Sequence, residues 1–177
     1  MIRAPFLLSL GVALACAAPA HAQSRHDTNA PIDFSAEHGE LQDREGRAVL
    51  NGNVRISQAE MTLTAARVTV SFTGQVIEGS PQVSRLDAAG GVTLTRPDQN
   101  ARADFATYDL NRRVITLIGG VTLRQGVNTL QGGRVTIDLD TGRATMDGSS
   151  VRGSTDGTTR QNGRVSGRFS VPKRNDD

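Results

Sequence analysis

Aromatic residues are scarce in this chain of 177 residues, which has no tryptophan, one tyrosine and 3% aromatic residues overall. Because proteins hold single-stranded nucleic acid largely by stacking bases on aromatic rings, this composition argues against such a platform. The net charge is only +2, from 20 basic and 18 acidic residues, so the chain lacks a field strong enough to attract polyanions. We therefore expect no nucleic-acid partner.

The single cysteine, Cys16, lies in an apolar run near the amino terminus. Arg3 precedes this run, which extends from Phe6 to Cys16, and Ala20-His-Ala22 follows it; the order is typical of a secretory signal peptide. The run is shorter than the roughly 20 residues that cross a bilayer as a helix. We expect cleavage after Ala22 and a mature chain without cysteine, with a lipid anchor on Cys16 as the alternative.

Apolar and polar residues alternate from Ile32 to Val151. A period of two residues predicts β-strands with one buried and one solvated face, and no segment shows the spacing of an amphipathic helix. The sequence therefore predicts an all-β protein. The residues expected to share the buried face are Val54, Ile56, Met61, Leu63, Val68, Val70, Phe72, Val92, Leu94, Tyr108, Leu110, Ile115, Leu117, Val121, Leu123, Val135, Ile137 and Leu139.

Similar short segments recur within this region. Gly52-Asn-Val-Arg-Ile56 resembles Gly90-Gly-Val-Thr-Leu94 and Gly119-Gly-Val-Thr-Leu123. Because each unit is too small to fold alone, the repetition predicts hairpins stacked along one axis. We interpret the Gly-Asn and Gly-Gly pairs as tight turns between strands, since glycine adopts positive φ at little cost.

Residues with catalytic or metal-binding chemistry form no convincing constellation. His26 is expected in an amino-terminal tail, and His38 in an exposed turn, although Glu37 and Glu40 could in principle join His38 around a metal. The serines lack a Gly-x-Ser-x-Gly motif with a partner histidine, and the glycine pairs lack the ending of a phosphate-binding loop. We expect no enzyme activity, no catalytic residue, no metal site and no cofactor.

Several segments, in order, resemble the LptA family of periplasmic lipopolysaccharide-transport proteins, part of the OstA-like superfamily. Residues 31–36, 41–46, 49–56 and 65–70 resemble the amino-terminal half of that family, and Ala103 to Leu123 resembles the second half, including Tyr108-Asp-Leu110. Arg164 to Pro172 is similar to the closing strand. The polar insertion at 153–163 departs from the family pattern.

This resemblance implies an antiparallel β-jellyroll, open in cross-section as a V or U, whose apolar interior holds the acyl chains of lipid A. Together with the residue patterns, it gives the following expected organisation: a cleavable signal peptide (1–22), an N-terminal tail (23–30), the jellyroll (31–151), a flexible polar loop (152–163), a closing strand (164–171) and a C-terminal tail (172–177). The residues expected to line the lipid-binding groove are Ile32, Phe34, Val54, Ile56, Leu94, Tyr108, Leu110, Val121 and Leu123.

The partners implied by the resemblance are lipopolysaccharide, an LptC-like subunit of an inner-membrane complex and an LptD-like outer-membrane translocon. Unpaired edge strands near 32–36 and 164–171 would also join copies of the chain by β-augmentation. Two alternatives stay open at this point. One is an LptC-like subunit associated with the inner membrane, and the other is a lipid-free β-scaffold that polymerises.

Overall fold

The computed structural model describes residues 26–74, 79, 81–148 and 164–169. The expected signal peptide, with Ala22 and Cys16, the polar loop 152–163 and the tail 172–177 lie outside the described residues. Within the described ranges no helix has the length and apolar character needed to cross a membrane. The elements are β1 (Ile32–Ser35), β2 (His38–Gln42), the 3-10 helix η1 (Asp43–Glu45), β3 (Arg47–Gln58), β4 (Met61–Thr73), β5 (Gln82–Thr95), β6 (Gln99–Asp109), β7 (Val114–Gln125), β8 (Asn128–Asp138), β9 (Ala144–Asp147) and β10 (Ser166–Arg168).

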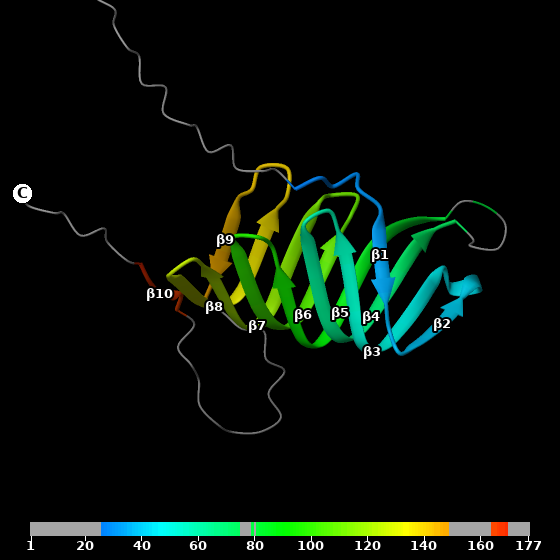
Figure 1. Ribbon diagram of the computed structural model, residues 1–177, viewed down its shortest axis with the longest axis horizontal. Coiled ribbons are helices and arrows are strands. Elements are labelled where there is room, and N and C mark those ends of the chain that lie inside the picture. Colours follow the sequence, from blue (N-terminus) through cyan, green and yellow to red (C-terminus); the bar gives the residue numbers. More distant parts are fainter. Residues whose placement is uncertain (1–25, 75–78, 80, 149–163, 170–177) are drawn as a thin grey trace, which may run out of the picture.

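The strands form one antiparallel sheet in which β3 to β8 are neighbours in chain order. At one end, β1 pairs with residues 55–58 of β3 and β2 pairs with residues 47–51 of the same strand. At the other end, β10 pairs with residues 129–131 of β8 and β9 pairs with residues 134–137. At each end of the sheet, two short strands therefore lie one after the other along the edge of one long strand (Figure 1).

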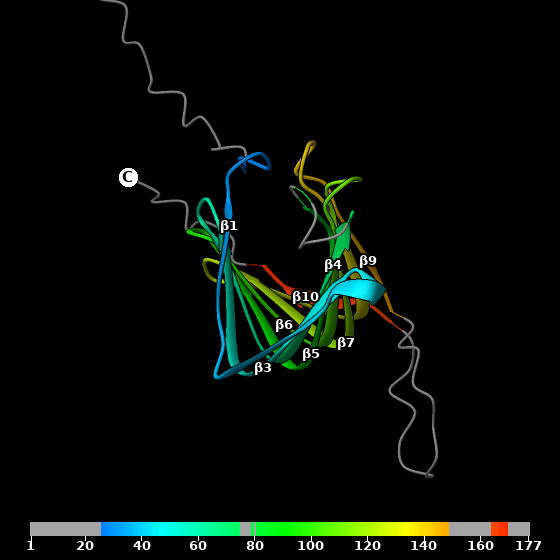
Figure 2. The same cartoon turned by 90° about the vertical axis from the view of Figure 1, so that its right-hand side faces the viewer.

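Every long strand bends near its midpoint, so the sheet folds lengthwise into two arms. The bend divides β3 between Asn51 and Val54, β5 between Ala89 and Val92, and β7 between Ile118 and Val121. We call the half that carries β1 and β10 arm 1, and the half that carries β2 and β9 arm 2. Viewed along the sheet, the arms rise from a common folded edge and leave one side open (Figure 2).

The glycine pairs lie at these bends, not at hairpin turns, so our interpretation of them as turns was wrong. Their positive φ angles were anticipated, with +85° at Gly119 and +52° at Gly120. In each case two residues oppose one on the neighbouring strand, which defines a β-bulge that bends its strand. The hairpin turn between β3 and β4 contains Ala59 instead, with φ of +48°.

The alternating apolar residues form the core between the arms, as the sequence predicts. Among the shared-face residues, Val54, Val68, Ile115, Leu117 and Val135 are fully buried. The buried residues of both arms make one continuous cluster, which we call the inter-arm core. The expectation of an all-β, open antiparallel architecture is confirmed.

Candidate functional site

Cross-strand pairing places the expected groove residues on the inner faces of the two arms. Directly opposed residues of an antiparallel pair point to the same face, so the register defines rows that run along each arm. One row on arm 1 contains, in order, Phe34, Ile56, Leu63, Leu94, Ala101, Leu123 and Leu130. A row on arm 2 contains Leu41, Ala48, Val70, Leu86, Tyr108, Ile115, Ile137 and Ala144.

Seven of the nine expected residues lie on arm 1 and only Tyr108 and Leu110 lie on arm 2. Their exposure divides them into three groups. Half-buried positions are held by Ile32, Leu110 and Leu123, and only Phe34 is exposed, at 65%. The buried ones are Val54, Ile56, Leu94, Tyr108 and Val121. The nine expected groove residues are thus all apolar, and the exposed one among them, Phe34, lies on β1.

Sequence reasoning missed one inner-face residue of a different kind, Gln58. It continues the alternation of Val54 and Ile56, so its parity alone placed it inside, but its polar side chain suggested the solvated face. It is 3% exposed, and its Oε1 accepts a hydrogen bond of 2.8 Å from the Tyr108 hydroxyl. Tyr108 is 2% exposed, and burial raises its pKa to about 12, so the phenol stays protonated at neutral pH.

The segment expected to be an N-terminal tail also contributes to this cluster. The Gln58 Nε2 donates hydrogen bonds of 3.0 Å to the backbone oxygens of Thr28 and Ala30. The His26 Nε2 lies 3.3 Å from the Gln58 Oε1. Hydrogen bonds therefore attach residues 26–30 to Gln58, the last residue of β3.

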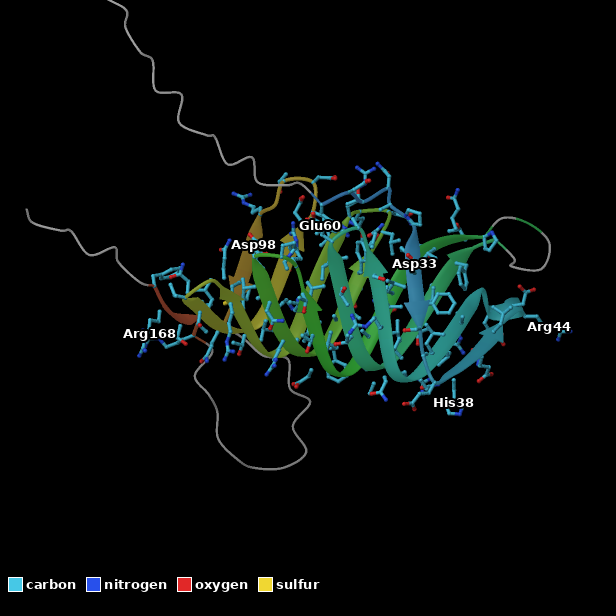
Figure 3. The ribbon with its side chains drawn as sticks, viewed as in Figure 1. Asp33, His38, Arg44, Glu60, Asp98 and Arg168 are labelled. Atoms are coloured by element: carbon cyan, nitrogen blue, oxygen red, sulfur yellow. The ribbon has the colours of Figure 1, made fainter. Side chains whose placement is uncertain are left out.

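Polar and charged side chains occupy the outer faces and the rims (Figure 3). His38 is exposed, as expected, but it begins β2 and does not lie in a turn. In the part of the chain that the structure describes, no group of three His, Cys, Asp or Glu side chains could hold a metal ion. A hollow of about 250 Å³ lies on the outer face of arm 2 beside Arg67 and Phe105, and it is below the usual size of a ligand pocket.

Comparisons with known proteins identify the fold and the family of this chain. An open antiparallel sheet folded into two arms with an apolar interior is the architecture of the LptA-like jellyroll. Residues 33–143 match the family model described as the LptA/(LptD N-terminal domain) LPS transport protein. The chain belongs to this family.

Two individual proteins are similar to the chain. One is an uncharacterized protein of Rhizobium meliloti, 30% identical over 116 residues, a match covering 63% of this chain and 62% of that protein. The chain thus matches less than two thirds of this relative. The other is the crystal structure of LptH, described as the LptA-homologous periplasmic component of the lipopolysaccharide transport device of Pseudomonas aeruginosa. Its TM-score is 0.66 at 22% identity, with 82% of this chain and 99% of that chain covered, which shows a shared fold.

Proposed function

We propose that this protein binds lipopolysaccharide in the periplasm and carries it between the two membranes, with the lipid A acyl chains held between the arms. The observation that carries the proposal is the inter-arm core, a continuous aliphatic interior in a sheet that is open along one side, in a chain of the LPS-transport family. Eight strands at about 4.8 Å spacing make arm 1 roughly 30 Å long, which is enough for acyl chains laid along it.

The energetics of the cargo explain why such an interior is needed. Burying one methylene is worth about 0.8 kcal/mol, so exposing an acyl chain of a dozen carbons to water costs on the order of 10 kcal/mol. A carrier must therefore shield hydrocarbon along its whole path. Proteins that bind hydrocarbon this well release it slowly, so directional flow requires energy from a partner. We assign that role to an inner-membrane complex with an LptC-like subunit, and delivery to an LptD-like outer-membrane translocon.

Photo-crosslinking tests where lipid lies. We expect a photoreactive residue at Ile32 or Leu123, both half-buried on inner faces, to form adducts with lipopolysaccharide. The same residue at Arg55 or Thr122, which are directed outward by the register, should form few or none. Thr122 is the sharper control because it adjoins Leu123 in β7. Adducts that are equal or stronger at the outward positions would contradict an interior binding site.

We further propose that copies join end to end through the terminal strands. The inner face is exposed at both ends, at Phe34 and Leu41 on one and at Val165 and Phe169 on the other. Outward-facing charges are complementary along arm 1, with Asp33 on β1 at one end and Arg168 on β10 at the other (Figure 3). Strand pairing across such ends would make the aliphatic interiors continuous.

Truncating Phe34 tests this end-to-end contact. Because the Phe34 side chain is 65% exposed, Phe34→Ala should barely change monomer stability. Loss of an aromatic anchor from an interface costs at least about 1.4 kcal/mol, so self-association measured by sedimentation equilibrium should weaken about tenfold or more. Phe105→Ala is the matched control, because Phe105 is 54% exposed on the outer face of β6, away from both ends. A strict monomer at all concentrations, or equal effects of the two variants, would contradict the contact.

A further inference from the structure

Gln58 is the one buried polar or charged residue in the described part of the chain. Burying a carboxamide is costly unless its hydrogen bonds are satisfied. Both the nitrogen and the oxygen of the Gln58 carboxamide have partners. The Nε2 donates to the backbone oxygens of Thr28 and Ala30, and the Oε1 accepts from the Tyr108 hydroxyl. Gln58 therefore joins three segments that are separate in the chain.

The hydrogen bond to Tyr108 connects the two arms. Gln58 ends β3 on arm 1, where it pairs with Met61 and Ile32. Tyr108 lies near the end of β6 on arm 2, where it pairs with Leu86 and Ile115. Gln58 and Tyr108 thus lie at the strand ends away from the bends of β3 and β6. The segment before β1 lies on the open side of the folded sheet (Figure 2). The contact thus closes the open side at this point along the sheet.

Tyr108 also stands beside the smallest side chains of the interior. The neighbouring inner row contains the pair Ala88 and Ala106 on the central strands β5 and β6, and both alanines are buried. Tyr108 is the largest residue on the inner faces of these two strands. When its ring moves away, the space that it leaves is bordered by alanine and aliphatic groups, which suit a hydrocarbon chain.

We propose that Gln58 and Tyr108 form a releasable clasp across the open side, and that an acyl chain entering between the arms takes the place of the Tyr108 ring beside Ala88 and Ala106. The inference rests on the proposed lipid-carrying function and adds to it the place and the residues of entry. A neutral hydrogen bond changes an equilibrium by only about 2- to 12-fold, so the clasp holds the arms together without locking them.

Tyr108 itself supplies the measurement, because the chain has one tyrosine and no tryptophan. Purified lipopolysaccharide in detergent is titrated into the full wild-type chain while Tyr108 fluorescence is followed, with detergent alone as the blank. Binding is measured in parallel with radiolabelled lipopolysaccharide. We expect the emission to change in step with binding, because the phenol loses its amide partner. This arm needs no substitution and does not depend on a variant that folds.

Association kinetics of Tyr108→Phe form the second arm. This variant keeps the ring and removes the clasp hydrogen bond, so radiolabelled lipopolysaccharide should associate about 2- to 12-fold faster. Thr107→Val is the matched control. It removes a 2.9 Å hydrogen bond from Thr107 to Asp87 on the outer face of the same strand, and it should associate at the wild-type rate. A purely structural role for Tyr108 would lower stability without making association faster.

The outcomes separate the clasp from the proposed function. Lipid that binds while Tyr108 emission stays constant, or a Tyr108→Phe variant that associates no faster than Thr107→Val, overturns the clasp and leaves lipid carriage standing. Wild-type protein that binds no labelled lipopolysaccharide overturns both. Emission that follows binding, together with faster association only in Tyr108→Phe, supports the clasp.

Discussion

Gly119→Ala is expected to lower the free energy of unfolding by about 3 kcal/mol, and Gly120→Ala by about 1 kcal/mol. Both glycines have positive φ, which costs an L-residue about 1–2 kcal/mol. Only at Gly119 would a Cβ also collide with a neighbour, because it would overlap the Asp104 Oδ2 and lie 2.9 Å from the Asp104 Cβ. A Cβ at Gly120 has no heavy atom within 4 Å. Denaturant unfolding of the two variants measures the difference.

A double variant identifies the source of the additional loss. Removing the opposing side chain in Gly119→Ala/Asp104→Gly abolishes the collision but keeps the positive φ at position 119. Its free energy of unfolding should therefore fall less than the sum of the two single losses. Equal losses for Gly119→Ala and Gly120→Ala, or strict additivity in the double variant, would show that collision with Asp104 does not cause the additional loss.

The bend also shows why the sequence predicted the inner face better than the connections. Alternation gives the face of Val68 or Val135 directly, because side-chain direction has a period of two along each half of a strand between its end and its bend. A glycine pair indicates only that the backbone needs positive φ, and a hairpin turn and a bulge share that need. The positive φ values at Ala59 and Arg113 occur in residues with no turn signature, so nothing local identified those connections.

For the candidate site, the sequence likewise predicted which residues face inward but not which distant residues touch. Ile56, Leu94 and Leu123 follow from alternation, and the structure places them in one row. The partner of Tyr108 could not be found in this way, because Gln58 is 50 residues away in the chain. Their contact depends on how far the whole sheet folds over. Similarly, Phe34 has inner-face parity but is exposed, since it lies on the edge strand β1, beyond which the described residues form no further strand.

Leu117→Ala is expected to lower the free energy of unfolding of the lipid-free protein by about 3 kcal/mol. Leu117 is fully buried in the inter-arm core, where it is directly opposed by Ala106 on β6 and Val135 on β8. The strands around it are hydrogen-bonded on both sides, so the backbone has little freedom to fill the space. Thr116→Ala, on the outer face beside it, should cost less than about 1 kcal/mol. Denaturant unfolding without lipid measures both values.

Repeating the unfolding with saturating lipopolysaccharide asks whether this core is also the cargo site. A ligand that binds only the folded state stabilises it in proportion to its affinity, and each lipid methylene that fills the space left by Leu117 recovers about 0.8 kcal/mol. Lipid should therefore stabilise Leu117→Ala more than wild type, and Thr116→Ala no more than wild type. If lipid stabilised all three chains equally, the leucine would support the sheet without touching the cargo. A selective gain would mean that, without cargo, the protein's own side chains fill the space that hydrocarbon occupies during transport.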